Sequence, residues 1–364
     1  MDSPLKYFAE VRDPRVERTR EHLLEEILLI AIAAVLSGAG SWNEIEGYGK
    51  AKRPWFKGFL QLPGGIPSHD TFNRVISALD PVEMEKGFAD WVVSIAKLTS
   101  GEVVAIDGKA LCGTREAGKK TLVHMVSAWA NANSLVLAQR KVDDKSNEIT
   151  AIPKLLDALE LSRAVVTIDA MGCQRNIAEK IVAKKADYVL AVKENQGHLL
   201  DQIKDSFQML GADAVAEDVD CGHGRVEQRR CSVIADLSLL EKPGEWASLQ
   251  GLVRIESVRY HKATGKTESE TRYYITSLKP DAARLNQVIR QHWGIENKLH
   301  WALDVSFGED LDRKRQKNAA QNFSLLNRIA LNLLKQDKTC TLGIKGKRLK
   351  AGWDNDYLLQ LLGN

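Results

Sequence analysis

The sequence predicts an α/β protein, in which a mixed-sheet core carries a β-rich insertion and follows an N-terminal helical domain. Three observations support this class. The first hundred residues show helical periodicity, short apolar runs then alternate with helices from residue 101, and a stretch after residue 197 alternates polar with apolar residues. We therefore divide the chain into a helical domain (1–98), a core (101–312, with the insertion at about 197–281) and a basic helical C-terminal region (313–364).

The first domain contains three amphipathic or apolar segments separated by glycine and proline breaks, namely LLEEILLIAIAAVL, SWNEIEGYGKAK and SHDTFNRVISAL. The apolar run 27–36 is shorter than the roughly 20 residues that span a bilayer, and it follows acidic residues. It therefore predicts a buried helix. The segments could form a helix-turn-helix that contacts DNA or a domain that serves only packing, and both readings stay open.

The core is predicted from a succession of strand and helix patterns. Three strands come first, and a helix, a strand, a helix and a strand follow, which together predict one mixed α/β layer. In chain order these segments are 103–107, 122–131, 134–142, helix 148–161, 165–170, helix 174–185 and 187–192.

The insertion is predicted to be β-rich because RVEQRRCSVIADL, LVRIESVRYH and SETRYYITSL alternate in polarity, with a turn at Thr264-Gly265 between the last two. Helical periodicity returns at about residue 282. It continues through LNQVIRQHWGIENKLHWALD and again through QNFSLLNRIALNLLKQ.

Charge and cysteine content exclude several classes of protein. The 364 residues carry 51 basic and 48 acidic side chains, a formal net charge of +3, so a uniformly basic coat protein and an acidic disordered chain are excluded. Five dispersed cysteines without a C-x-x-C pair indicate neither a disulfide framework nor a zinc ribbon. The balance is uneven, however, since residues 313–350 hold 11 basic residues and 1 acidic residue.

Three carboxylates are the candidate catalytic residues. Asp107 and Asp169 each end an apolar strand-like run, where the sites of α/β sheets are found, although a single such Asp commonly caps a turn. Glu296 lies between His292 and His300 at four-residue spacing on a predicted helix, and a buried Glu paired with a neighbouring base is the plainer reading. Converging carboxylates repel unless cations neutralise them, and their hard oxygens suit Mg²⁺ or Mn²⁺. A zinc hydrolase using His292 and His300 is a weaker alternative, because the H-E-x-x-H arrangement is missing.

Basic residues near these carboxylates are candidate phosphate contacts. The runs RKRQK (313–317) and KGKRLK (345–350) suit nonspecific backbone contacts, although a charge run is usually only solvated. Lys109 would point to the same side of its strand as Asp107. Arg225, Arg229 and Arg230 alternate with other residues in the insertion, where an ion-paired face is an equal alternative.

Taken together, the fragments AIDGKALCGT, VVTIDAMGCQRNIA, DYVLAVKENQ, GHGRVEQRR, RYYITSL and HWGIENKLHWALDVSFGEDLDR resemble the bacterial insertion-sequence DDE transposases of the H-repeat-associated type. The resemblance covers nearly the whole chain, from PLKYFAEVRDPR to NRIALNLLK. It implies an RNase H-like core in which Asp107, Asp169 and Glu296 form a catalytic, metal-binding triad.

The resemblance further implies Mg²⁺, with Mn²⁺ as a substitute, and double-stranded DNA (element ends and target) as the partner. It also implies a homo-oligomer in the DNA complex and a bacterial cytoplasmic, nucleoid-associated location without membrane contact. An inactive DNA-binding protein or repressor derived from a mobile element is the alternative, and it would need no triad.

One part of the related signature is absent. Many related transposases have Tyr, Arg and Lys around the Glu, and the corresponding residues here are Ile289, His292 and Leu303. We therefore expect other groups to bind phosphate. The candidates for this role are His292, Lys298 and Arg313. The full set of candidate DNA-binding residues also contains Lys109, Arg225, Arg229, Lys314, Arg315 and Lys317.

Overall fold

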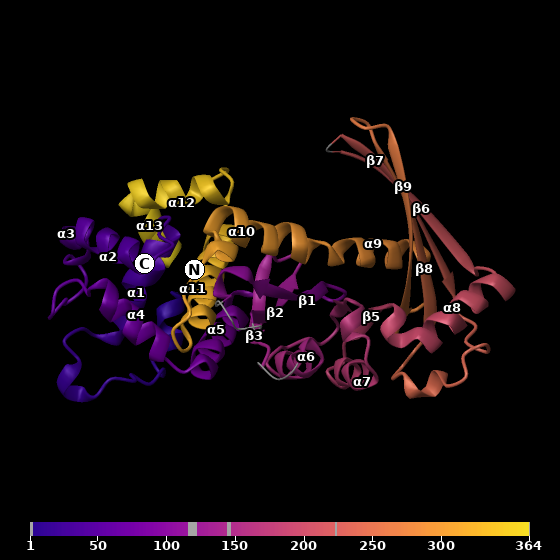
Figure 1. Cartoon of the computed structure of the whole chain (residues 1–364), viewed down its shortest axis with the longest axis horizontal. Helices are drawn as coiled ribbons and strands as arrows, with labels where there is room; N and C mark the ends of the chain where they lie inside the picture. The colour runs from indigo at the N-terminus through magenta and orange to yellow at the C-terminus, as the bar shows by residue number, and fades with distance from the viewer. Residues whose placement is uncertain (1–2, 116–121, 144–146, 223, 364) are drawn as a thin grey trace.

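The computed structural model describes residues 3–115, 122–143, 147–222 and 224–363. Its centre is one continuous nine-stranded sheet with the order β3-β2-β1-β4-β5-β9-β8-β7-β6 (Figure 1). The strands are β1 (Val103–Leu111), β2 (Val123–Ala130), β3 (Leu135–Lys141), β4 (Val165–Ile168), β5 (Asp187–Val192), β6 (Ala214–Gly222), β7 (Arg225–Ile234), β8 (Gly251–His261) and β9 (Lys266–Thr276).

Strand directions divide the sheet into two halves. In the first half, β1 pairs antiparallel with β2, and β2 with β3, whereas β1, β4 and β5 run parallel. In the second half, β6 to β9 form an antiparallel meander that joins the first half through the β5–β9 pair. The predicted mixed α/β layer is therefore present. The β-rich insertion extends the same sheet instead of forming a separate one.

Helices cover both faces of the first half. Apolar residues at helical spacing pack α6 (Glu148–Asp157) and α7 (Arg175–Ala183) on one face, and α9 (Ala282–His292) lies on the other (Figure 1). Between β5 and the meander lies α8 (Gly197–Met209), which the sequence analysis missed by predicting a β-rich stretch from residue 197. Its buried residues Leu199, Leu200, Ile203 and Phe207 have helical, not strand, spacing.

The N-terminal and C-terminal helices pack together at the other end of the molecule, where the two ends of the chain also lie (Figure 1). The 18-residue α11 is buried along nearly its whole length, against α1, α4, α5 and β3. These helices are α1 (Leu24–Leu36), α2 (Trp42–Ala51), α3 (Arg53–Phe56), α4 (His69–Ala78), α5 (Pro81–Ile95), α10 (Trp301–Phe307), α11 (Ala319–Gln336), α12 (Ile344–Trp353) and α13 (Asn355–Leu362).

As predicted, the apolar run 27–36 is a buried helix, α1. Within the described ranges, none of the helices has the length and apolar character that crossing a membrane would require.

Candidate active site

Asp107 and Asp169 lie next to each other because β1 and β4 are parallel and in register. Their last paired residues are Ile106 and Ile168, and each Asp follows directly. The prediction that Asp107 ends its strand was wrong, since β1 continues to Leu111 by pairing with β2 alone. The polar residues from Asp107 onward broke the apolar run by which the strand was recognised.

Asp169 also caps a turn, which was the alternative to a catalytic role in the sequence analysis. Its Oδ1 accepts hydrogen bonds from the backbone N–H of Met171 (3.2 Å) and of Gly172 (3.4 Å), which begins a short 3₁₀ turn. These bonds hold the carboxylate at the end of β4.

Glu296 comes from a π-helical turn (Ile295–His300) that interrupts the helix predicted across this segment and separates α9 from α10. Such turns widen the helix locally and occur frequently at functional sites. Buried Ile295 and Leu299 anchor the turn in the core, while Glu296 stays exposed. Three segments far apart in the sequence thus converge, since Asp107, Asp169 and Glu296 line one cavity of about 380 Å³.

Burial, and after it repulsion between the carboxylates, raises the pKa values of Asp107 and Glu296. Burial, followed by the charge of Asp169 and a smaller effect of Glu296, raises the pKa of Asp107 to about 7. The side chain of Glu296 reaches solvent, but the protein around its carboxylate still removes enough water to raise its pKa, an effect that Arg272 opposes and Asp169 strengthens. The cavity therefore has an unfavourable excess of negative charge.

Burial favours the uncharged forms of the two histidines around Glu296 by lowering their pKa values. Burial lowers the pKa of His292 to about 4, and its Nδ1 lies 2.9 Å from the hydroxyl of Thr167 on β4. Burial also lowers the pKa of His300 to about 3, and its Nδ1 lies 3.6 Å from Asp107 Oδ2. Burial thus disfavours the positive charge with which His292 would attract a phosphate. The two rings face different partners, which gives no support to a shared zinc site.

A fourth carboxylate, Glu148, was not found by the sequence analysis. It lies in the first turn of α6 with its carboxylate against Gly108, and its charge contributes to the raised pKa of Asp107. Burial, then Asp169, raises the pKa of Glu148 itself. The helix was predicted to begin at this residue, but its contact with β1 depends on tertiary packing.

Basic residues that line the acidic cavity were also missed. Lys193 follows β5 directly, Lys204 comes from α8 and Arg272 from β9. The rule that identified Asp169, a polar residue at the end of a parallel strand, applies equally to Lys193. Arg272 pairs with Glu270 at 2.7 Å and lies over the ring of Trp293, with its guanidinium carbon 4.7 Å from the ring centre.

The predicted phosphate-binding residues are found in different environments. Arg225, Arg229 and Lys298 line a second cleft beside Glu296. Arg313, Arg315 and Lys317 are exposed in the segment before α11.

Other members of the basic runs are bound inside the protein. Lys109 is buried and pairs with Asp304 (2.7 Å) and Asp310 (2.6 Å). The Lys314 side chain is only 7% exposed, where it pairs with Asp312 and donates a hydrogen bond to the Gly40 carbonyl. Because both lysines have partners inside the protein, we expect neither Lys109 nor Lys314 to contact DNA.

Two residues of the 345–350 run are likewise buried. Lys347 donates to the carbonyls of Leu334 and Asp337 at the end of α11, and Arg348 donates to the carbonyls of Val35 and Ser306. This part of the run supports helix packing.

The donor set of the cavity suits a hard divalent cation, because carboxylate oxygens predominate and their repulsion would be relieved by positive charge. As they stand, no three His, Cys, Asp or Glu side chains of the described residues are close enough to hold a metal ion. Side-chain adjustment would therefore have to accompany metal binding.

Comparison with known proteins shows the family to which the chain belongs. Residues 98–333 match the family described as "Transposase DDE domain", and residues 5–92 match the domain described as "DDE_Tnp_1-associated". The chain belongs to the transposase DDE family.

Its relatives include "Putative transposase YncI" of Escherichia coli O157:H7, which is 40% identical over 100% of this chain and 95% of the relative. "H repeat-associated putative transposase YhhI" of Escherichia coli K12 is 38% identical over 98% of this chain and 97% of the relative. A further relative, "Inactive transposase YbfQ", matches 15% of this chain at 45% identity.

Proposed function

We propose that this transposase binds the ends of its insertion element, cleaves the DNA there and joins the ends to a target in a Mg²⁺-dependent reaction. The observation that carries the proposal is the convergence of Asp107, Asp169 and Glu296 on one cavity from β1, the end of β4 and the π-helical turn. The β3-β2-β1-β4-β5 order, with β1, β4 and β5 parallel, further supports assigning the first half of the sheet to the RNase H-like class.

In this proposal Asp107, Asp169 and Glu296 hold the divalent ions, and Glu148 stands beside them. When bound, such ions stabilise the charge that develops in phosphoryl transfer and lower the pKa of the attacking hydroxyl. The fold positions the three carboxylates. The β1–β4 register fixes the two aspartates, and buried Ile295 and Leu299 fix the turn that carries Glu296.

Positive charge on the rim would hold the DNA backbone against this acidic centre. Lys193, Lys204 and Arg272 line the cavity itself, and Arg313, Arg315 and Lys317 are exposed on the connection before α11. In this proposal the basic residues of the cavity hold a phosphodiester at the carboxylates, and the exposed residues before α11 contact the backbone elsewhere along the duplex. Assembly of two chains on a pair of element ends is part of the same proposal.

The test is cleavage and joining of oligonucleotides that carry the element ends, with Mg²⁺ or Mn²⁺. Asp107→Asn, Asp169→Asn and Glu296→Gln should each abolish cleavage while binding of the same oligonucleotides persists. Wild-type protein that binds the ends without cutting them would instead support the repressor alternative.

A further inference from the structure

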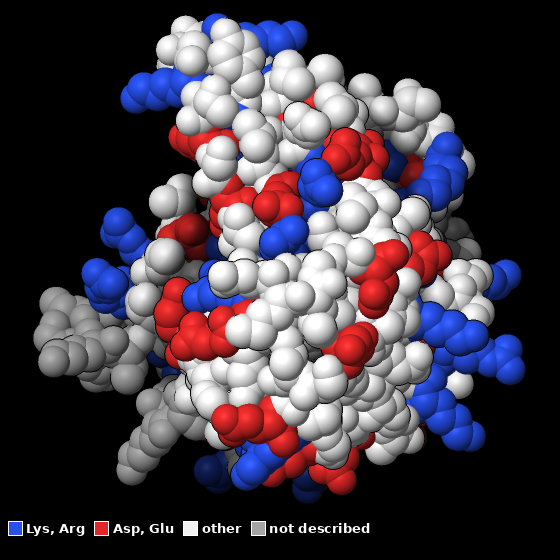
Figure 2. All heavy atoms as spheres, turned by 90° about the vertical axis from the view of Figure 1, so that its right-hand side faces the viewer, with Lys and Arg blue, Asp and Glu red and all other residues white. Residues whose placement is uncertain are grey.

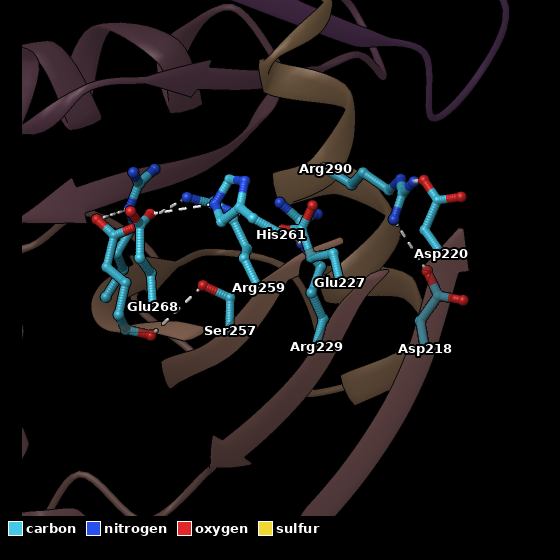
Figure 3. A network of polar contacts seen from close by, with 11 residues as sticks. Asp218, Asp220, Glu227, Arg229, Ser257, Arg259, His261, Glu268 and Arg290 are labelled. Carbon is cyan, nitrogen blue, oxygen red and sulfur yellow. Dashed lines mark hydrogen bonds and ion pairs between the residues drawn. The ribbon is translucent and has the colours of Figure 1, made fainter. Parts of the chain in front are cut away.

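The side of the meander that faces α9 changes character along its strands. Cys231 and Val233 of β7 belong to the apolar cluster with α9, and the next residues on the same face are Arg229, Glu227 and Arg225. The register places Ser257, Arg259 and His261 of β8 beside these three, in that order. The face therefore continues past the core as a charged surface (Figure 3).

This charged surface and the C-terminal part of α9 enclose a second cleft, of about 610 Å³. Arg225, Arg229 and Arg259 line it from the sheet, Arg290 lines it from α9, and Lys298 from the π-helical turn. Its acidic lining consists of Asp220, Glu227 and Glu296, so five basic groups face three carboxylates among the described residues.

Ion pairs hold most of these arginines in place. Glu227 Oε1 accepts from Nε of Arg229 (3.0 Å) and of Arg259 (3.3 Å), and Arg290 reaches across to Asp218 and Asp220 on β6 (Figure 3). Guanidinium groups fixed in this way are already oriented, which reduces the entropy lost when an anion binds.

One donor in the cleft is left without a partner. The Arg229 side chain is 8% exposed, and its buried Nη1 finds no hydrogen-bond acceptor in the described part of the chain. A buried guanidinium nitrogen without an acceptor is unfavourable, and an oxyanion in the cleft would satisfy it.

The second cleft adjoins the acidic cavity, since Trp293 and Glu296 line both. The end of the molecule formed by the meander and α8 shows acidic and basic side chains interspersed in the view of Figure 2, without a continuous basic surface there. The inner cleft, rather than this outer face, therefore offers oriented cations beside the carboxylates.

We propose that the cleft between the meander and α9 binds a backbone phosphate of the DNA strand whose neighbouring phosphodiester lies at Asp107, Asp169 and Glu296. The proposal rests on the proposed function for the identity of the anion. Arg229 is the principal donor, and Arg225 and Lys298 at the open side of the cleft complete the binding of the backbone.

The experiment measures binding of a fluorescent DNA duplex of arbitrary sequence, without divalent cations, over a range of salt concentrations. Arg229→Gln should weaken binding roughly threefold to tenfold and reduce the slope of log K against log salt by about 1, the contribution of one phosphate contact. Arg230→Gln is the matched control, because Arg230 is the next residue of β7 but lies exposed beside Glu217 on the opposite face. Arg225→Gln provides a second, exposed position at which folding is not at risk.

Equal affinities and salt slopes for Arg229→Gln, Arg225→Gln and Arg230→Gln would overturn the site. Cleavage with Mg²⁺ is scored separately. Arg229-dependent binding by a protein that never cuts DNA would refute the proposed function and leave the phosphate site standing.

Discussion

The carboxylate of Glu148 occupies the space that a side chain at position 108 would need. A Cβ on Gly108 would overlap Oε1 of Glu148, whose charge contributes to the raised pKa of the neighbouring Asp107. The glycine therefore lets a fourth carboxylate approach the two aspartates.

Gly108→Ala should displace Glu148 and lower the rate of DNA cleavage by roughly tenfold to a hundredfold, because small shifts of groups at a reacting centre are costly. The melting temperature should change little, since the displaced group is the far end of a flexible side chain. Gly244→Ala, where a Cβ would meet nothing within 4 Å, is the control. Cleavage by Gly108→Ala at the rate of Gly244→Ala would show that the position of Glu148 does not matter.

Removing one charge from the acidic cavity should stabilise the metal-free protein. Asp107→Asn eliminates repulsion with Asp169 and Glu296, so we expect its melting temperature without divalent ions to exceed that of the wild type by about 2 to 4 °C. Added Mg²⁺ should raise the melting temperature of the wild type but not of the variant, since the ion stabilises only a chain that binds it. Asp90→Asn is the control, because Asp90 forms an exposed ion pair with Lys86. Mg²⁺ should raise the melting temperature of this variant as it raises that of the wild type. An equal Mg²⁺ effect in Asp107→Asn would argue against Asp107 as a ligand.

Folding stability should depend on pH through Glu85, which lies on α5 between Gln321 and Arg140. Burial raises its pKa to about 7, from the ordinary 4.5. The folded chain thus holds this proton more tightly than the unfolded chain. The stabilisation is fully present below about pH 4.5 and is lost as the pH rises through 7.

Urea unfolding at several pH values should therefore give a free energy of unfolding that falls by about 2 to 3 kcal/mol from this group between pH 5 and 8. Glu85→Gln should remove that fall, because the amide does not ionise. A constant difference between wild type and variant across this range would contradict the assignment.

Arg313 and Lys314 are neighbours in the sequence, but we expect Lys314 to contribute to folding stability and Arg313 to DNA binding. Lys314 Nζ lies 3.5 Å from the ring centre of Phe323 and bonds Asp312 and the Gly40 carbonyl, so Lys314→Met should lower the free energy of unfolding by about 1 to 3 kcal/mol. Arg313 is exposed, and Arg313→Gln should reduce the salt dependence of DNA binding without changing stability. Unfolding and binding measurements on both variants test the pair, and a change in salt dependence for Lys314→Met alone would reverse the assignment.

Much of the fold could be predicted because its core segments carry uninterrupted apolar patterns. The predicted bounds of β5 match the structure, and those of β2, β3 and α11 agree to within a few residues. The helix α8 was missed although Leu199, Ile203 and Phe207 have helical spacing, because the alternating strands that follow were taken to begin at Gly197.

Fewer residues of the candidate site could be predicted from the sequence, because several reach it only through tertiary packing. The ends of two apolar runs located Asp107 and Asp169, but the approach of Glu148 to Gly108 depends on how α6 packs over β1. The local excess of basic residues could not distinguish exposed Arg313 from buried Lys314, since both look alike until the chain has folded. The roles of all these residues in catalysis and DNA binding remain predictions.

The burial of α1 has a consequence for the order in which the chain can fold. Its apolar residues, including Ile27 and Ile32, are covered partly by α11, which begins almost 300 residues later in the sequence at Ala319. During synthesis the N-terminal helix must therefore leave the ribosome long before its partner exists. A chain interrupted before α11 would keep an uncovered, strongly apolar helix, which makes it a natural substrate for chaperones and proteases. Stable folding of the N-terminal helices therefore requires that synthesis has reached the end of α11.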